Sequence, residues 1–290
     1  MKLGLVSNCW RVQLTGGKDL AELIENALRL GYRSVELRQG CLGKYETDMG
    51  LPKPESLQLL AERFPDVQFN IALNLPFFAG IVTPTSKPFV YALRAAEAVA
   101  GVFGVHLRLV DLATREPCLD ARVLGTLIAQ LTHALIGVRG ILSLENASQR
   151  WEVLRQVHRH ARAQLGDDAG ALQFCYDACN FVRVTGRTQQ FPQRLRRGDV
   201  ALIHLKQSRD GVTRPTFEPG DVDWSLQLAA LARIDYAGPA LFEIAPHENI
   251  WDNLAESRNY LESLALGRGL GFRQLAVAPA GSGRKTKWHL

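Results

Sequence analysis

Four apolar runs along the chain end in, or are followed at once by, side chains that can bind a metal ion. These side chains are Glu145, Asp177, His204 and Glu243. Three carboxylates brought to one place would repel one another and raise each other's pKa, unless a positive charge lay between them. Three carboxylate ligands and one imidazole suit Mn²⁺, Mg²⁺, Co²⁺ or Zn²⁺, with positions left open for another molecule. We therefore predict a site for one divalent metal ion.

Each of these residues also has an ordinary structural explanation. A carboxylate at the end of a strand is often the N-cap of the next helix or a solvated loop residue. His204 alone could be a core histidine whose hydrogen bonds are satisfied. Four suitable residues at the ends of four successive strands are harder to explain in this way, so we favour the metal site.

Such a site requires a fold that brings distant residues together. Short apolar, β-branched runs predict strands at 3–6, 34–37, 67–73, 104–110, 140–145, 172–177, 200–205 and 239–244. Amphipathic patterns predict helices at 19–31, 54–64, 89–101, 120–135, 150–166 and 253–267. Short buried strands that alternate with helices indicate a parallel sheet. Eight of them predict an α/β fold, a single-domain (β/α)8 TIM barrel, over residues 1–266.

The main rival fold is an open Rossmann-like sheet. Its fingerprint G-x-G-x-x-G is absent from the turn after the first predicted strand, which reads SNCWRVQLTGG. In a barrel, the carboxyl ends of all the strands converge on one cavity. Further polar and aromatic residues near strand ends are therefore candidates for binding a substrate. These are Trp10, Arg38, His106, Asn180, Lys206, Arg209 and His247.

Composition and charge narrow the classes of function. The 290 residues are 47% hydrophobic and 22% charged, and the formal net charge of +5 gathers partly in RLRRGD at 194–199 and in the tail at 281–290. We expect 194–199 to be the solvated end of a helix, and 267–290 to be a flexible, basic extension. Without a concentrated basic surface, a nucleic-acid partner is not favoured.

Compartment and assembly are predicted from simple features. Five cysteines without C-x-x-C spacing indicate reduced thiols. No signal peptide and no apolar segment of spanning length is seen, so we expect a cytoplasmic protein with no membrane partner. A homo-oligomer is compatible with these features.

The chain resembles the xylose isomerase-like barrels, a family of sugar isomerases, epimerases and related enzymes. The resemblance covers most of residues 1–265 and rests on five segments in the family's order. They are LGYRSVELR (30–38), LSLENAS (142–148), CYDACN (175–180), IHLKQS (203–208) and PGDVDWSLQLAALARIDYAGPALFEI (219–244). The resemblance implies that Glu145, Asp177, His204 and Glu243 hold the divalent metal.

The resemblance also implies an activity. Glu145 and Glu243 would be the acid/base pair of an isomerase or epimerase that acts on a sugar or another polyhydroxylated hydroxy-carbonyl compound. The reaction would move a proton through a metal-stabilised enediolate. Asp177 and His204 would mainly hold the ion. Asp221 and Asp223 would fix a loop and begin a helix rather than contact the substrate.

Two positions depart from the family's patterns, and three other functions remain open. Asn180 replaces a histidine of many epimerases, and Gln207 replaces the aspartate of H-x-K-D, which weakens the predicted support of His204.

A metal-dependent lyase of the same fold, either a dehydratase or a C-glycoside-cleaving enzyme, is the main alternative. An endonuclease IV-like DNA-repair enzyme is disfavoured because Asn74 and Asn180 stand where zinc-binding histidines are needed. An inactive partner subunit is the third alternative, which the complete ligand set opposes.

Overall fold

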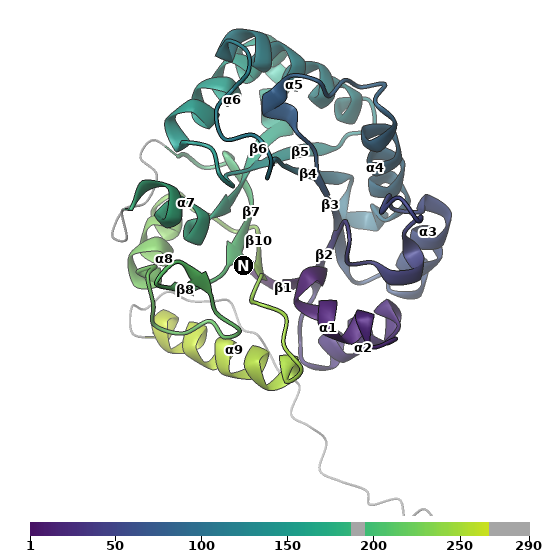
Figure 1. Cartoon of the computed structure of the whole chain (residues 1–290), viewed down its shortest axis with the longest axis vertical. Helices are drawn as coiled ribbons and strands as arrows, with labels where there is room; N and C mark the ends of the chain where they lie inside the picture. The colour runs from purple at the N-terminus through teal and green to yellow at the C-terminus, as the bar shows by residue number, and fades with distance from the viewer. Residues whose placement is uncertain (187–194, 267–290) are drawn as a thin grey trace, which may run out of the picture.

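A closed barrel of parallel strands forms the centre of the molecule (Figure 1). The computed structural model describes residues 1–186 and 195–266. In these residues the barrel strands are β1 (Lys2–Val6), β2 (Ser34–Arg38), β3 (Gln68–Asn74), β4 (His106–Val110), β5 (Ile141–Glu145), β6 (Leu172–Asp177), β7 (Val200–Leu205) and β10 (Pro239–Phe242). Their order is β1-β10-β7-β6-β5-β4-β3-β2, and β1 pairs with both β2 and β10. The predicted (β/α)8 barrel is confirmed.

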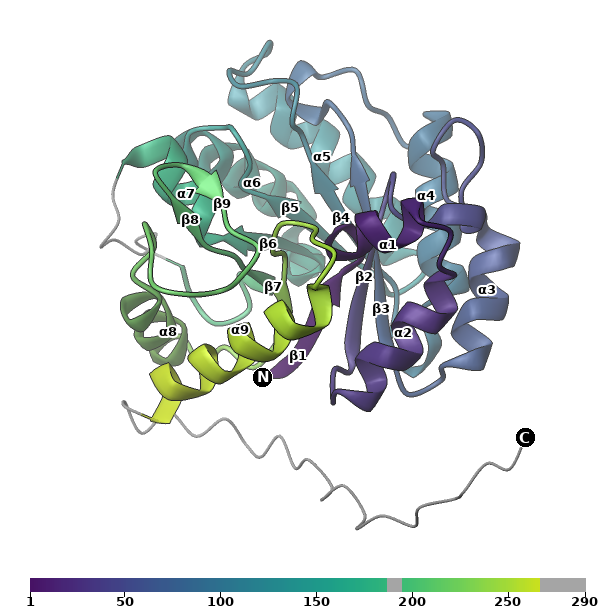
Figure 2. The same cartoon turned by 60° about the horizontal axis from the view of Figure 1, so that its bottom comes forward.

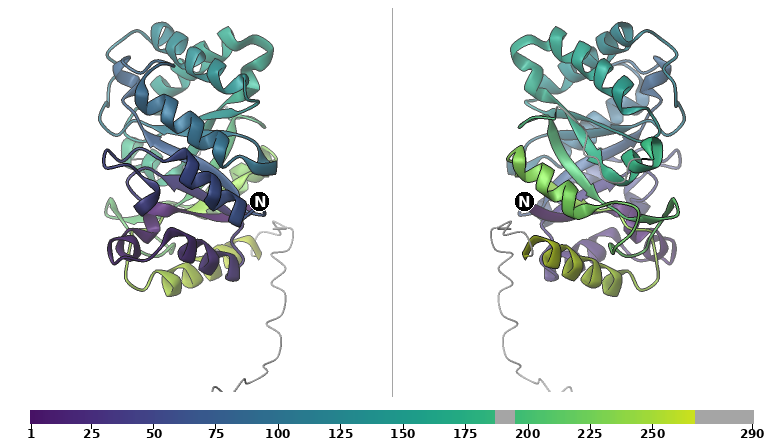
Figure 3. Two further views of the ribbon diagram at one scale, coloured as in Figure 1. Left: turned by 90° about the vertical axis from the view of Figure 1, so that its right-hand side faces the viewer. Right: turned by 90° about the vertical axis from the view of Figure 1, so that its left-hand side faces the viewer.

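Helices surround the barrel on its outer side (Figures 1 and 3). The helices of the described residues are α1 (Arg11–Thr15), α2 (Leu20–Arg29), α3 (Pro54–Arg63), α4 (Lys87–Ala98), α5 (Ala121–Ile136), α6 (Trp151–Leu165), α7 (Ala178–Thr185), α8 (Trp224–Arg233) and α9 (Ile250–Leu266). Single 3-10 turns are η1 (Ser7–Trp10), η2 (Gly43–Tyr45), η3 (Phe77–Ala79), η4 (Gly101–Phe103) and η5 (Gly166–Ala171). A small hairpin of β8 (Ser208–Arg209) and β9 (Val212–Thr213) follows β7. Helix α9 completes the ring between α8 and α2 (Figures 1 and 2).

The segment before β7 differs from the prediction. Residues 195–199 form a turn rather than the end of a helix, and the helix after β6 is α7, which begins at once after Asp177. The side chain of Asp177 caps α7, so the helix begins where the strand ends. Residue 194 and the predicted extension at 267–290 lie outside the described residues. In the part that the structure describes, no helix is long and apolar enough to cross a bilayer.

The apolar core lies mainly between the barrel and its helices. Inside the barrel, one small apolar cluster is formed by Val6, Cys175, Leu202 and Leu241, from β1, β6, β7 and β10. The inward positions of the opposite strands, β2 to β5, carry buried polar side chains. These are Ser34, Glu36, Asn70, His106, Arg108, Ser143 and Glu145. A barrel interior with this polar half requires internal pairing of its charges, because buried charges are costly unless they are paired and hydrogen-bonded.

Candidate metal centre

Four neighbouring strands bring the predicted metal ligands to one point. Glu145 ends β5, Asp177 ends β6, His204 lies in β7, and Glu243 directly follows β10. These strands are adjacent in the barrel, in the order β10-β7-β6-β5, and parallel strands present their carboxyl ends on the same face. One ligand atom from each residue lies within 4.8 Å of the others, and all four residues are buried.

The imidazole of His204 faces the three carboxylates with one nitrogen. Its Nδ1 lies 3.3 Å from Glu243 Oε2, 3.6 Å from Glu145 Oε1 and 3.8 Å from Asp177 Oδ2. Its Nε2 lies 3.2 Å from Glu36 Oε1, on the other side of the ring. A metal-binding histidine commonly donates its second N–H to a carboxylate in this way, which fixes the ring and its tautomer. Glu36 therefore orients His204 so that Nδ1 is available to a cation.

Glu36 is the centre of a buried charge network below the carboxylate cluster. It accepts hydrogen bonds from Arg108 Nε at 3.3 Å, from Arg108 Nη2 and from Asn70 Nδ2 at 2.7 Å. Burial opposes ionisation of Glu36, but the charges of Arg108 and His204 outweigh it and hold the pKa of this carboxyl well below its usual range. Glu36 therefore stays ionised and can accept a hydrogen bond from His204 Nε2.

Glu145 is held in place by two donors. Arg108 Nη1 donates to its Oε2, and Asn180 Nδ2 donates to its Oε1 at 3.0 Å. Asn180 stands in the first turn of α7, so the helix that Asp177 caps also positions Glu145.

Glu243 has a matching pair of donors. Asn8 Nδ2 donates to its Oε1 at 3.1 Å, and Lys206 Nζ donates to its Oε2 at 3.0 Å. Burial raises the pKa of Glu243, but the charges of Lys206, His204 and Arg38 lower it well below the ordinary value. Each glutamate of the predicted acid/base pair is thus oriented by one amide and one cation.

Asp177 combines the ordinary role and the predicted one. Its Oδ1 accepts the backbone N–H of Asn180 at 2.7 Å as the N-cap of α7, and its Oδ2 accepts from Lys206 Nζ at 3.1 Å. The Asn146 side chain bonds both the N–H and the C=O of Asp177, each at 2.8 Å. These bonds fix the backbone at the end of β6, so Oδ2 is aimed at the cluster.

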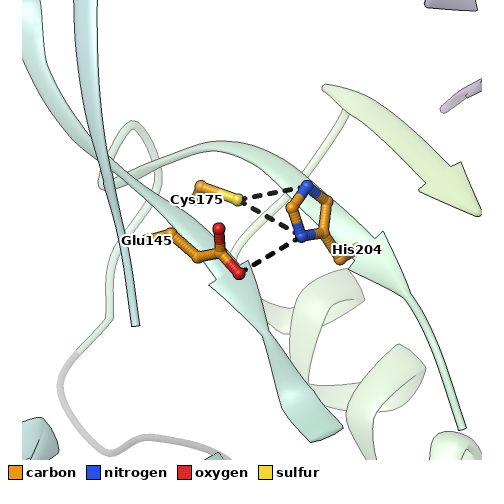
Figure 4. Close-up of side chains that lie close together, drawn as sticks. All are labelled: Glu145, Cys175 and His204. Carbon is orange, nitrogen blue, oxygen red and sulfur yellow. Dashed lines mark hydrogen bonds and ion pairs between the residues drawn. The ribbon is translucent and has the colours of Figure 1, made fainter. Parts of the chain in front are cut away.

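Cys175 lies against His204 without pointing at the carboxylate cluster. Figure 4 shows the Cys175 thiol and the Glu145 carboxylate facing the imidazole from β6 and β5. The sulfur lies 3.5 Å from Nε2 and 3.8 Å from Nδ1, so it is nearer to the nitrogen that Glu36 engages. Burial raises the pKa of the thiol to about 12, which keeps it protonated. Glu145, Cys175 and His204 could also hold an ion, but the group with Asp177 and Glu243 has the better donors.

The donor set fits a divalent cation. Four buried carboxylates, Glu36, Glu145, Asp177 and Glu243, face two permanently charged side chains, Arg108 and Lys206. Burial lowers the pKa of His204, but the carboxylates of Glu243, Glu36 and Asp177 raise it well above its ordinary value. The carboxylates around the ring therefore favour a positive charge at Nδ1, which can be a proton or, in its place, a metal ion. Oxygen donors with one imidazole match Mn²⁺, Mg²⁺, Co²⁺ or Zn²⁺.

The structure places the predicted substrate-binding residues in two groups. Asn180 and Lys206 contact the cluster, and the charge of Arg38 acts on Glu243. The other four have different partners. His106 bonds Ser143 at 2.8 Å near the start of β4, and Trp10 is buried against Trp251. Arg209 is exposed and lies 3.8 Å from Glu218, and His247 is exposed and accepts from the Asn249 N–H. Burial lowers the pKa of His106 to about 4, so it is neutral.

Asn8, Glu36, Arg108 and Asn146 were not among the predicted site residues, although they hold the cluster in place. For Glu36 and Arg108, the signal in the sequence is a polar residue at every second position of a buried strand, as in Ser34-Glu36-Arg38 and His106-Arg108. Gln207 does not touch His204 and instead holds the loop before α8, where it accepts from Val222 N–H at 2.9 Å. The weakened support expected for His204 is therefore wrong, because Glu36 supplies it.

Asp221 and Asp223 have the predicted structural roles. Asp221 accepts from Ser208 Oγ at 2.8 Å and from the Gly211 N–H at 3.0 Å, which ties the hairpin to the following loop. Asp223 is the N-cap of α8 and accepts from the Leu226 N–H at 3.0 Å.

Comparison of the sequence with models of protein families identifies the family of this chain. The model described as the xylose isomerase-like TIM barrel matches residues 24–265. The chain belongs to this family. Comparison of this xylose isomerase-like barrel with curated proteins finds no match.

Solved structures with a similar fold belong to proteins with different functions. The IolI protein with a bound zinc atom has a TM-score of 0.68 and 15% identity, over 92% of this chain and 99% of that chain. The probable 3-DHS dehydratase AsbF from Bacillus anthracis has a TM-score of 0.65 and 14% identity, over 90% and 99%. D-allulose 3-epimerase from Methylomonas sp. has a TM-score of 0.62 and 13% identity, over 91% and 98%. At these identities the likeness shows the fold alone.

Proposed function

We propose that this xylose isomerase-like barrel is a divalent-metal-dependent isomerase or epimerase of a sugar, a sugar derivative or another hydroxy-carbonyl compound. The observation that carries the proposal is the pair of glutamates, Glu145 and Glu243, on opposite flanks of one cluster. Their strands, β5 and β10, are separated by β6 and β7, which supply Asp177 and His204. Two carboxylates placed in this way can reach one substrate carbon from two sides.

Glu145, Asp177, His204 and Glu243 would hold one metal ion, either Mn²⁺, Mg²⁺, Co²⁺ or Zn²⁺. When bound, such an ion supplies positive charge to the substrate oxygens that become more negative as a neighbouring proton leaves. The IolI protein, a structure of similar fold, has a bound zinc atom, which supports the proposal that a barrel of this kind holds a metal ion.

The two glutamates would transfer the proton. One carboxylate removes the proton from the carbon next to the carbonyl, and the other glutamate gives a proton to the opposite face. Asn8 fixes Oε1 of Glu243 and leaves Oε2 facing His204. In Glu145, Arg108 holds Oε2, and Asn180 donates to the Oε1 that faces His204. Lys206 and Arg38, which are both half-buried beside the cluster, would bind oxygen atoms of the substrate.

The proposal is tested by deuterium exchange in D₂O, followed by NMR on a panel of ketoses and hydroxy-ketoacids with each divalent ion added in turn. Exchange at the carbon next to the carbonyl reports proton removal, whatever product forms. Glu145→Gln and Glu243→Gln should each slow exchange by about a hundredfold or more, since a positioned acid or base contributes at least that factor. Glu116→Gln changes an exposed glutamate that pairs with Arg150 and is the matched control.

The products separate the candidate reactions. Exchange with the carbon skeleton and all hydroxyl groups retained supports an isomerase or epimerase. Exchange with loss of water or of an aglycone would contradict an isomerase or epimerase and support a lyase, the class to which the probable dehydratase AsbF would belong. Full exchange in both glutamine variants would contradict the assigned roles of Glu145 and Glu243.

A further inference from the structure

A pocket on the outside of the barrel gathers five arginines away from the candidate metal centre. It lies between α6 and the turn before β7, and its volume is about 530 Å³. The arginines that line it are Arg155, Arg159, Arg162, Arg196 and Arg197. Asp199 is the acidic residue of this lining. The pocket therefore concentrates positive charge to a degree that composition alone did not indicate.

The arginines come from two sides of the pocket. Arg155, Arg159 and Arg162 follow one another at intervals of four and three residues in α6, so they share one face of the helix. Arg196 and Arg197 come from the turn that precedes β7. Like charges at such spacing on a helix repel one another, so this arrangement is unfavourable unless an anion lies among them.

The single acidic residue of the lining is already engaged. Asp199 accepts from Arg162 Nη1 at 2.7 Å and from the backbone N–H of Arg196 at 2.9 Å. These bonds tie the turn to α6 and give the pocket a fixed shape. Arg197 lies 4.0 Å from Asp235, and both side chains are more than three-quarters exposed, so this pair is weak.

Three guanidinium groups remain available. Among the residues that the structure describes, the side chains of Arg155, Arg159 and Arg196 make no hydrogen bond or ion pair. Guanidinium groups form bidentate hydrogen bonds with phosphate and stay charged throughout the ordinary pH range. The pocket also has the size of a small-molecule site, which is commonly 300 to 1,000 Å³.

The pocket and the candidate metal centre lie at opposite ends of the barrel strands. The turn at 195–199 precedes β7, whereas His204 and Asp177 stand towards the carboxyl ends of their strands. The inner wall of the pocket contains His158, which is stacked on Phe174 with ring centroids 3.9 Å apart. Burial and the charge of Arg162 lower the pKa of His158 to about 3, so the positive charge comes from the arginines alone.

We propose that this arginine pocket is a second binding site, for a small ligand that carries two or three linked phosphate groups. Such a chain of phosphates presents several negative charges and many acceptor oxygens within a short length. It can engage the arginines of α6 and those of the turn at the same time. A ligand with a single carboxylate would leave most of the free guanidinium groups without a partner. The site is independent of the activity proposed for the metal centre.

The test is isothermal titration calorimetry of the full chain with inorganic pyrophosphate and with tripolyphosphate, at physiological salt. The double variant Arg155→Gln/Arg159→Gln and the variant Arg196→Gln should each weaken binding by tenfold or more. Arg122→Gln, an exposed arginine of the neighbouring helix α5 outside the pocket, should change the affinity by less than twofold. Thermal unfolding of each variant verifies that it is folded.

Four results would overturn the proposal. The first is an absence of binding at millimolar concentrations of both anions. The second is an equal loss of affinity in Arg122→Gln, which would indicate general attraction to a basic protein. The third is a loss of affinity in Lys206→Gln, which would move the anion to the metal centre. The fourth is binding of nucleic acid that neither anion displaces, which would make the arginines a surface for a macromolecule.

Discussion

At the scale of single residues, Arg108 decides whether the polar interior is stable. Its guanidinium lies between Glu36 and Glu145, and all three side chains are almost completely inaccessible to solvent. Glu36 in turn orients His204, and Glu145 belongs to the candidate metal centre. Arg108 therefore holds Glu145 directly and, through Glu36, fixes the orientation of His204. An uncompensated buried carboxylate is far more costly than an exposed one.

We expect Arg108→Leu to lower the free energy of unfolding by about 3 to 5 kcal/mol, because two buried carboxylates would lose their partner. Chemical denaturation measures the change. Arg63→Leu removes an arginine from its exposed pair with Glu25 and should cost about 1 kcal/mol or less. Equal losses in the two variants would mean that Arg108 contributes no more than a surface ion pair.

At the scale of elements, β1 lies too close to its two neighbouring strands for a side chain at Gly4. A Cβ atom on Gly4 would lie 2.2 Å from the Ser34 carbonyl oxygen in β2 and 2.5 Å from Leu241 Cδ2 in β10. The carbonyl belongs to the backbone of a neighbouring strand and cannot move without disturbing the pairing of β1 with β2. Glycine is therefore required here by close approach rather than by backbone conformation.

Gly4→Ala should destabilise the protein by about 1 to 3 kcal/mol or more, as overpacking of a closely packed core does. Gly170→Ala is the matched control, since a Cβ there meets no atom within 4 Å and the residue has no positive φ. Its effect should stay within about 0.5 kcal/mol. Midpoints of urea unfolding compare the two variants, and a neutral Gly4→Ala would show that β1 can shift away from β2.

At the scale of the whole molecule, closure of the barrel brings residues that are far apart in the sequence close together in space. Glu145 and Glu243 are separated by 98 positions, yet their ligand atoms lie within 4.8 Å of one another. The cluster exists only when β5, β6, β7 and β10 are paired. A cation that binds the cluster should therefore bind the folded chain and not the unfolded one.

Such binding should raise the midpoint of thermal unfolding. A divalent ion at about a hundred times its Kd stabilises the folded state by about 2.7 kcal/mol, or roughly 5 to 10 °C for a chain of this size. Asp177→Asn should abolish the rise, while asparagine can still cap α7. Asp66→Asn, at an exposed aspartate, should leave it unchanged. Differential scanning fluorimetry with Mn²⁺, Mg²⁺, Co²⁺ and Zn²⁺ measures it, and no rise with any ion would contradict the metal centre.

Much of the fold was predictable because its signals are local. The apolar runs and the amphipathic periods placed the barrel strands and most of the helices within a few residues. The prediction that 194–199 ends a helix is wrong for residues 195–199, which form a turn. The start of α7 directly after β6, where the side chain of Asp177 caps the helix, was not predicted. Caps of this kind depend on where a strand ends, which periodicity locates only approximately.

The sequence by itself determined the barrel and nominated Glu145, Asp177, His204 and Glu243, because residue type and position at a strand end are properties of short segments. Only the tertiary structure decided that Glu36 supports His204, that Arg108 joins Glu36 to Glu145, and that Asn8 and Asn180 orient the two glutamates. It also assembled the arginine pocket from α6 and the turn before β7. The physical reason is that hydrogen bonds and ion pairs depend on distances between side chains, and closure of the barrel alone sets those distances for residues far apart in the chain.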